Sequence, residues 1–166
     1  WKSPEYRRAL ILSLRDACKN LTPYSHDSLS SSKFLDTEVP EVEQLCSILE
    51  NVLLHGIKIR EFQNIIPFWG LLERLEVLNP PCINLRNSVG AVACCNYLRN
   101  PLGKARGWIR QSLNAKSLDD SIQYMINQSN WINKFYYPEA ILRVKSDAEM
   151  LVCYTFPLPH LFAFLT

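Results

Sequence analysis

The sequence predicts an all-α fold, a single globular bundle of helices, and three observations support this class. Apolar residues recur at three- and four-residue spacing in most of the chain, which is the period of an amphipathic helix. No segment shows the sustained apolar–polar alternation of a half-buried strand. Only 5 of the 166 residues are glycine, which argues against a turn-rich all-β fold.

Length and composition favour one domain spanning residues 1–166. The chain is 48% hydrophobic and 20% charged, and 166 residues are enough to bury a full core. The net charge of +2 argues against a dedicated nucleic-acid binder. The sequence opens at Trp1 without a signal-peptide pattern, so we expect a domain of a longer multidomain protein.

Two consecutive helices are predicted between Pro101 and Ile126, joined at residues 114–117. Proline suits the first turn of a helix, and Ser117 is placed to cap the second one. The first helix has one apolar face, formed by Ala105, Trp108, Ile109, Ser112 and Leu113. The second has an apolar stripe formed by Leu118, Ile122, Met125 and Ile126, with Asp119 and Asp120 in its first turn.

Two helices are predicted in the N-terminal part. The first runs from Glu5 to Leu21, with Tyr6, Ala9, Leu10 and Leu14 on its apolar face, Ala17 and Cys18 behind them, and Arg7, Arg8 and Arg15 on other sides. Residues 22–39 form a loop that we expect to be mobile. The second helix starts at Pro40, and its apolar stripe is Val42, Leu45, Cys46, Leu49, Val52 and Leu53.

Gly56 is expected to end this second helix in a left-handed conformation. His55 has no partner at metal-ligand spacing, so we interpret it as a histidine favoured by the helix C-terminus.

Further helices are predicted at residues 65–78, 85–98 and around 131–136. In the first of these, Trp69 lies at the edge of an apolar stripe formed by Phe68, Leu71, Leu72, Leu75 and Leu78. The aromatic cluster at 131–136 is expected to pack in the core, and Pro138–Glu139 to start another helix. Residues 150–165 are apolar but too short to span a membrane, and prolines interrupt them, so we expect a buried helix to about Phe156 and an irregular tail.

No motif for catalysis, nucleotide binding or metal binding is present in the sequence. The three histidines are scattered, and no GxSxG, HExxH or Walker-type loop occurs. The six cysteines form no CxxC pair, and we interpret them as small buried hydrophobic residues in a reducing compartment. We therefore expect no enzyme activity, no cofactor and no metal.

Four blocks of the sequence together resemble the RUN domain family, over about residues 41–145. The most specific is the third, in which a glycine–basic–tryptophan–arginine run precedes Lys-Ser-Leu. The blocks are LCSILENVLLHGIK (45–58), FWGLLERLEVL (68–78), GKARGWIRQSLNAKSLDDSIQYMI (103–126) and FYYPEAILR (135–143). The long serine-rich loop at 22–39 and the prolines near the C-terminus depart from the family pattern.

The resemblance implies a non-catalytic all-α domain of about eight helices, in a cytoplasmic protein that associates peripherally with endosomal or Golgi membranes through its partner. The expected partner is a small GTPase of the Rab, Rap or Arf-like groups. Two alternatives are a scaffold for a motor adaptor or cytoskeletal protein, and direct docking on an acidic membrane. No nucleic acid is expected as a partner.

The predicted partner-binding residues are cationic. Lys104, Arg106 and Arg110 match the basic positions of the central family block, and the arginines of the first helix complete the set: Arg7, Arg8 and Arg15. A structural alternative is that Arg106 and Arg110 pair with Asp119, Asp120 or Glu50 and hold helices together.

Overall fold

The computed structural model describes residues 1–21, 39–58, 60–61, 64–65 and 67–158, and in this part of the chain it contains eight helices and one two-residue hairpin. The all-α prediction is confirmed. The helices are α1 (Pro4–Asn20), α3 (Pro40–Leu54), α4 (Phe68–Glu76), α5 (Ile83–Ala93), α6 (Pro101–Asn114), α7 (Leu118–Asn127), α8 (Ser129–Phe135) and α9 (Lys145–Thr155). In the hairpin, β1 (Arg60–Glu61) pairs antiparallel with β2 (Asn64–Ile65), Arg60 opposite Ile65.

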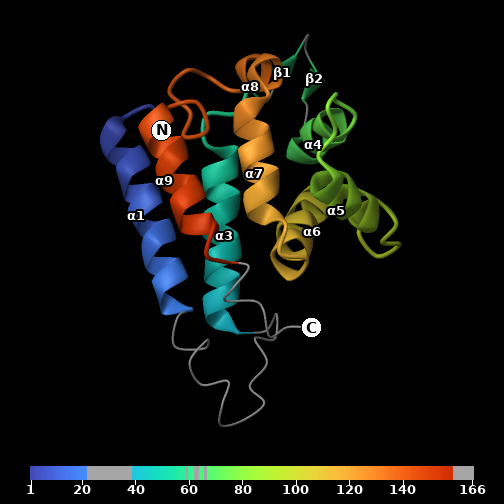
Figure 1. Ribbon diagram of the computed structural model, residues 1–166, viewed down its shortest axis with the longest axis horizontal. Coiled ribbons are helices and arrows are strands. Elements are labelled where there is room, and N and C mark those ends of the chain that lie inside the picture. Colours follow the sequence, from blue (N-terminus) through green and yellow to red (C-terminus); the bar gives the residue numbers. More distant parts are fainter. Residues whose placement is uncertain (22–38, 59, 62–63, 66, 159–166) are drawn as a thin grey trace.

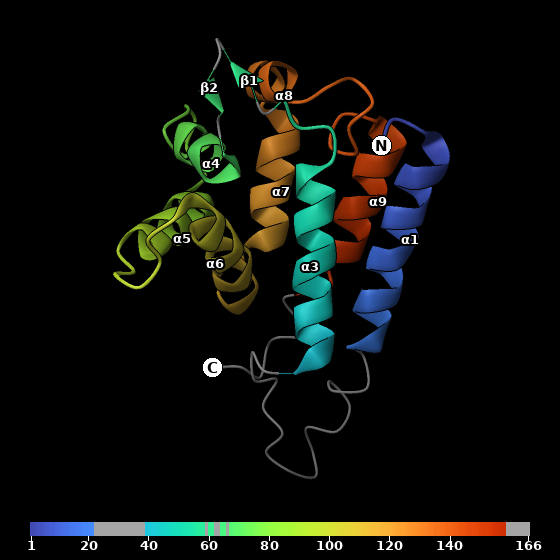
Figure 2. The same ribbon diagram turned by 180° about the vertical axis from the view of Figure 1, so that it is seen from behind.

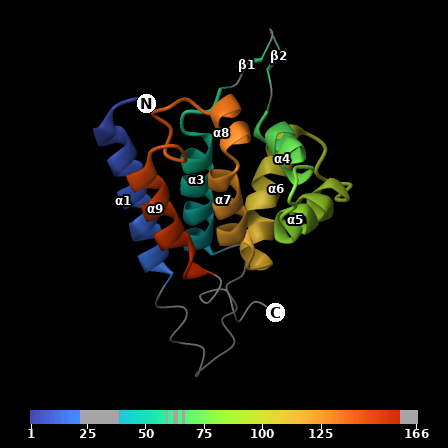
Figure 3. The same ribbon diagram turned by 45° about the horizontal axis from the view of Figure 1, so that its top comes forward.

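The helices form two groups that meet at α3 and α7. Helices α1 and α9 lie side by side at one edge, and α4, α5 and α6 form the other (Figure 1, Figure 2). Helix α3 packs against both α1 and α6, while α7 packs against α9, α5 and α6. Helix α8 lies at the same end of the bundle as the N-terminus and the hairpin (Figure 3). Helix α6 is therefore in contact with four neighbouring helices: α3, α4, α5 and α7.

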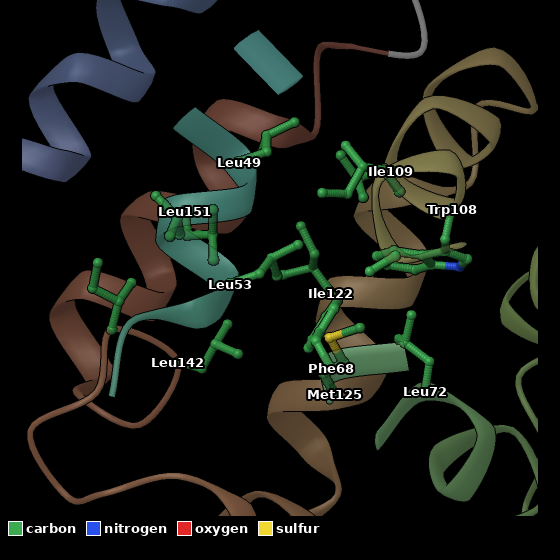
Figure 4. Close-up of a cluster of buried hydrophobic side chains, with 14 of the residues drawn as sticks. Leu49, Leu53, Phe68, Leu72, Trp108, Ile109, Ile122, Met125, Leu142 and Leu151 are labelled. Atoms are coloured by element: carbon green, nitrogen blue, oxygen red, sulfur yellow. The ribbon is translucent and has the colours of Figure 1, made fainter. Parts of the chain in front are cut away.

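One hydrophobic core runs through both groups. Leu49 and Leu53 of α3 lie between Leu151 of α9 and Ile122 of α7, and the side chains of α6 continue the cluster (Figure 4). Each of these four residues is at most 2% exposed. Burial of such side chains contributes about 1.5–3 kcal/mol each, so this shared core accounts for the packing of the two groups.

Helix α1 has the predicted bounds to within one residue, and its predicted face is buried in part. Leu14 and Ala17 are buried as predicted and Ile11 is buried as well, whereas Tyr6 and Ala9 are exposed. Helix α1 packs on both α3 and α9. Ser3 caps the helix by accepting a hydrogen bond from the Tyr6 N–H at 3.1 Å.

Helix α3 agrees with the prediction from Pro40 to its end. Its buried residues are Val42, Leu45, Leu49, Val52 and Leu53, and Cys46 is partly buried. Gly56 has φ +72°, which confirms the left-handed position. A Cβ there would lie 2.5 Å from the Cβ of Ala140, so glycine also permits this close approach.

His55 lies at the helix C-terminus as predicted, as the C-cap residue of α3, but hydrogen bonds rather than the helix dipole hold it there. The ring is buried, its Nδ1 accepts a hydrogen bond from the Ile141 N–H at 3.1 Å, and Nε2 donates to the Trp1 carbonyl at 2.8 Å. An acceptor at Nδ1 requires the neutral ring. Burial lowers the pKa of His55 from its ordinary value of 6.5.

Helix α4 starts later than predicted, at Phe68, because Asn64 and Ile65 belong to the hairpin and Pro67 is the N-cap. Trp69 is 3% exposed and belongs to the core rather than to its edge. The remaining predicted face is buried as expected, apart from the partly buried Leu78. Helix α5 ends at Ala93, five residues earlier than predicted.

The aromatic cluster packs in the core as predicted, but Pro138–Glu139 does not start a helix. Trp131, Phe135 and Tyr136 are buried. Residues 137–144 form turns, and two of their N–H groups bond to the end of α3 instead of within a helix: Tyr137 N–H donates to the Gly56 carbonyl at 2.8 Å, and Ile141 N–H donates to His55. Tertiary hydrogen bonds therefore replace the predicted helix.

The C-terminal helix α9 ends at Thr155, one residue from the predicted end. The apolar tail from 159 onward and most of the loop predicted at 22–39 lie outside the described residues. Within the described part, no helix is both long and apolar enough to cross a membrane.

All six cysteines are free thiols in the structure, and none is fully buried. The prediction that they are buried hydrophobic residues is therefore wrong, since four are partly buried and Cys94 and Cys153 are exposed. Cys18 comes closest to the prediction, because burial raises the pKa of its thiol to about 12.

Candidate functional site

Helix α6 begins with a well-formed N-terminal cap. The Asn100 side chain accepts a hydrogen bond from the Gly103 N–H at 2.7 Å, and Pro101 occupies the first turn. Gly107, one turn farther on, leaves room for Leu98: a Cβ at Gly107 would lie 2.7 Å from the Leu98 Cδ1. These local features fix the start of the helix on which the predicted site lies.

The buried face of α6 is the predicted one and sets the rotation of the helix. Ala105, Trp108, Ile109, Ser112 and Leu113 are all buried. The Trp108 indole donates a 2.9 Å hydrogen bond to Ser88 of α5 and lies 6.1 Å from the Phe68 ring of α4. Because Trp108 faces α4 and α5, the residues two positions before and after it point away from that contact.

The junction between α6 and α7 lies at the predicted residues. Lys116 has φ +57°, the Ser117 N–H donates to the Ser112 carbonyl at 2.9 Å, and the Lys116 N–H donates to the Leu113 carbonyl at 3.2 Å. This is a Schellman motif with lysine at the position that glycine usually takes. Ser117 is the N-cap residue of α7, but its hydroxyl makes no capping hydrogen bond, so that part of the prediction is wrong.

Lys104, Arg106 and Arg110 form a cationic flank on α6, and we use this name for these three residues. The Arg106 Nε lies 2.9 Å from the nearer carboxylate oxygen of Glu50 on α3, and the Arg106 side chain is still 59% exposed. Arg110 lies 3.9 Å from Glu43 and is 42% exposed. Lys104 Nζ lies 5.7 Å from the centre of the Trp69 ring. The two arginines therefore contact α3 without being buried by it.

The structural alternative for these arginines is supported in part. Glu50 is one of the three partners considered from the sequence, and it does pair with Arg106. Exposed ion pairs of this kind contribute only about 0–1 kcal/mol to the free energy of unfolding, however. Stabilisation of the fold is therefore a weak explanation for these arginines. Three cations against two carboxylates leave the flank with a net positive charge.

An apolar cavity of about 280 Å³ lies beside the cationic flank, between α3, α4 and α6. We call it the α3–α4–α6 cavity. Leu53, Phe68 and Ile109 form part of its buried floor, and Leu102 lies at its rim with 52% of its surface exposed. Glu50 contributes to the lining and also holds Arg106. Glu50 therefore links the cavity to Arg106 of the cationic flank.

The arginines of α1 lie on another part of the bundle. Arg7 is 14% exposed and its Nε donates to Asp147 of α9 at 2.8 Å. Arg8 is exposed, and Arg15 lies 3.1 Å from its neighbour Asp16. Arg7 thus has a partner within the fold, while Arg8 and Arg15 remain accessible.

Sequence reasoning missed Leu102 and the role of Glu50 as a cavity residue. Leu102 is three residues before Ala105 and so shares the predicted apolar face, which was the available signal. Its exposure could not be read from periodicity, because it depends on how far α3 and α4 extend beside the first turn of α6.

Comparison with known proteins identifies the family of this helical fold. The family model described as RUN domain matches residues 44–164, which include α3 from its second turn onward, α4–α9 and the whole cationic flank. The chain belongs to the RUN domain family. Arg7, Arg8 and Arg15 lie outside the matched region of this RUN domain.

Three human relatives show the same relationship at about 30% identity. The RUN domain is 31% identical to RUN and FYVE domain-containing protein 2 over 128 residues, which is 75% of this chain and 20% of that protein. It is 30% identical to Protein RUFY3 over 124 residues, covering 73% of this chain and 26% of that protein. RUN and FYVE domain-containing protein 1 is 30% identical over 118 residues, covering 69% and 16%. The matched part of the chain therefore spans 16–26% of the length of these relatives.

The described part of the RUN domain holds no cluster of three or more histidine, cysteine, aspartate or glutamate side chains that could bind a metal ion. Its most distinctive chemistry is the combination of exposed guanidinium groups with an apolar cavity. Such a surface is suited to binding a partner through hydrogen bonds and apolar contacts.

Proposed function

We propose that this RUN domain is a non-catalytic interaction module that binds a small GTPase of the Rab, Rap or Arf-like groups. The observation that carries the proposal is the cationic flank of α6 lying beside the α3–α4–α6 cavity. The family resemblance implies the class of partner, and the geometry supplies a surface suited to it.

The physical fit comes from the chemistry of a GTPase switch surface, an apolar patch with acidic rims. Arginine and aromatic residues dominate interface energetics, and apolar contact at the centre of an interface excludes water. Arg106 and Arg110 are exposed enough to reach a partner, although each also lies near a carboxylate of α3, Glu50 and Glu43 respectively. Lys104 contributes less, because its ammonium group lies over the Trp69 ring.

We propose secondary roles for the arginines of α1. Arg8 and Arg15 are accessible and can extend the contact or attract an acidic partner over a distance of about 10 Å. Arg7 is mostly occupied by Asp147, so its main effect is on stability.

The cellular role follows from the proposed partner. Binding to a membrane-attached GTPase would recruit the parent protein peripherally to endosomal or Golgi membranes, as a Rab effector or adaptor in vesicle traffic. The RUN domain would act as one module of a longer protein, which agrees with the small share of each relative that it matches.

The test is a binding assay against a panel of Rab, Rap and Arf-like proteins, each loaded with a GTP analogue or with GDP. We expect at least one member to bind preferentially in the GTP-loaded state, and Arg106→Glu and Arg110→Glu to weaken that binding about tenfold or more. Lys145→Glu is the matched control, since Lys145 is exposed in the first turn of α9, where an acidic residue is tolerated. Equal or absent binding in both nucleotide states across the panel contradicts the proposal and favours a nucleotide-independent scaffold.

A further inference from the structure

We infer that the α3–α4–α6 cavity receives one large apolar side chain of the partner, and that a carboxylate next to this side chain binds Arg106. The inference deepens the proposed function and rests on it for the identity of the partner. It assigns a specific recognition element: an apolar anchor residue with an aspartate or glutamate nearby.

The size of the cavity suits a single side chain. An engineered cavity of about 150 Å³ binds benzene, whereas sites for cofactors and drug-sized ligands occupy about 300–1,000 Å³. At about 280 Å³, the α3–α4–α6 cavity fits one phenylalanine, tryptophan, leucine or methionine side chain.

The walls of the cavity favour an apolar occupant. Leu53, Phe68 and Ile109 present hydrocarbon at its floor, and Leu102 and Pro101 present hydrocarbon at its rim. Leu102 is 52% exposed in the free domain, so a partner that covers it gains hydrophobic contact there as well. Glu50 is the charged residue of the lining, and its carboxylate is directed to Arg106.

The rim supplies the charge for an acidic neighbour of the anchor. Both hydrogen bonds from Arg106 to Glu50, at 2.9 and 3.2 Å, leave from Nε. Among the described residues, the two Nη groups of Arg106 have no hydrogen-bond partner. A guanidinium group held in this way can donate to a second carboxylate, and Glu50 acts as a positioning residue for it.

The spacing of these features constrains the motif. Arg106 directly follows Ala105, whose side chain lines the cavity, so the apolar and charged contacts are close together on α6. A partner helix would meet both with residues three or four apart, and an extended segment with residues two apart. The net positive charge of the flank selects an acidic rather than a basic residue at the second position.

The first arm of the test uses the GTPase identified by the panel assay. Leu102→Asp places a charge at the rim of the cavity, and Ala105→Leu fills it from within. We expect each to weaken GTPase binding at least tenfold. Ile83→Asp is the matched control because Ile83 is an exposed isoleucine of α5 that does not line the cavity, and it should bind like the wild type. Thermal unfolding checks that each variant is folded, and the exposed position of Leu102 makes Leu102→Asp the safer one.

The second arm uses a display library of random 12-residue peptides as the probe. We expect selected peptides to share a large apolar residue with an aspartate or glutamate within four positions, to compete with the GTPase, and to lose binding to Leu102→Asp. A peptide with lysine in place of its acidic residue should bind Arg106→Glu better than it binds the wild type. This exchange identifies Arg106 as the direct contact.

The outcomes separate the two hypotheses. If a GTPase binds in its GTP-loaded state and Leu102→Asp and Ala105→Leu bind it as well as the wild type does, the cavity inference is overturned and the proposed function stands. If no GTPase binds but the selected peptides carry the motif and depend on Leu102, the proposed function fails and the recognition element remains. Peptides without an apolar–acidic motif overturn the inference in either case.

Discussion

The Trp108 indole N–H donates a 2.9 Å hydrogen bond to the Ser88 hydroxyl, which ties the buried face of α6 to α5. We predict that Ser88→Ala lowers the free energy of unfolding by about 1–3 kcal/mol, because the buried N–H loses its partner. Urea denaturation followed by tryptophan fluorescence measures this change. Asn87→Ala, an exposed substitution one position away, should change it by less than about 0.5 kcal/mol.

A double variant separates the hydrogen bond from packing at Trp108. In a Trp108→Phe background the donor is absent, so adding Ser88→Ala should cost much less than it does in the wild type. Equal costs in the two backgrounds would show that Ser88 stabilises α5 in some other way, such as through its 2.9 Å bond to the Leu85 carbonyl.

Two glycines are predicted to respond to alanine in opposite directions. Gly56→Ala should cost about 2–4 kcal/mol, because its φ of +72° disfavours a side chain and the new Cβ would lie 2.5 Å from the Cβ of Ala140. Gly90→Ala should stabilise the domain by about 0.5–1 kcal/mol, because Gly90 lies inside α5 with open space around it. Thermal unfolding of the two variants beside the wild type gives the comparison. A Gly56→Ala variant as stable as the wild type would contradict the close approach to Ala140.

The region from Pro101 to Asn127 could be predicted almost residue by residue because its information is local. Pro101 and Asn100 set the start of α6, the apolar period sets its buried face, and the acidic residues of the first turn support α7. The cationic flank followed from that face, since residues that flank a buried stripe must point outward.

Other features depended on contacts between distant segments and could not be predicted. The helix expected after Pro138 is replaced by turns because Gly56 and His55 accept hydrogen bonds from Tyr137 and Ile141. Trp69 is buried because α4 is covered by neighbouring helices on more than the predicted side. The α3–α4–α6 cavity also exists only when three helices are assembled, so no pattern in one of them reveals it.

His55 is predicted to make stability fall at acidic pH. Burial lowers its pKa in the folded domain below the ordinary 6.5, with a smaller lowering effect from Arg7 and opposing effects from the Trp1 carbonyl and Asp147. The unfolded chain therefore takes up the proton first. The stabilisation is fully present above about pH 6.5 and declines below it, by up to about 1.4 kcal/mol per pH unit until the folded-state pKa is reached.

Urea denaturation at pH 7.5, 6.5, 5.5 and 5.0 tests this dependence. His55→Gln should be less stable than the wild type at pH 7.5, because glutamine does not bridge the Trp1 carbonyl and the Ile141 N–H as the imidazole ring does. The stability of this variant should also change less between pH 7.5 and 5.0 than that of the wild type. Parallel pH profiles for the two proteins would assign the acid sensitivity to other groups.

Arg7 and Arg8 are adjacent on α1 and are predicted to have separable effects. Arg7→Ala should lower the free energy of unfolding by about 2 kcal/mol, because it leaves the mostly buried Asp147 carboxylate without its 2.8 Å partner and releases α9 from α1. Arg8→Ala, at an exposed position, should change stability by less than about 0.5 kcal/mol.

The affinity for a GTP-loaded partner should show the reverse pattern. If α1 extends the interface, Arg8→Ala lowers this affinity, whereas a folded Arg7→Ala variant binds as the wild type does. Because both variants remove one arginine from the same helix, net charge cannot explain a difference between them. If Arg7→Ala loses affinity without losing stability, Arg7 belongs to the interface, and its ion pair with Asp147 does not stabilise the contact between α1 and α9.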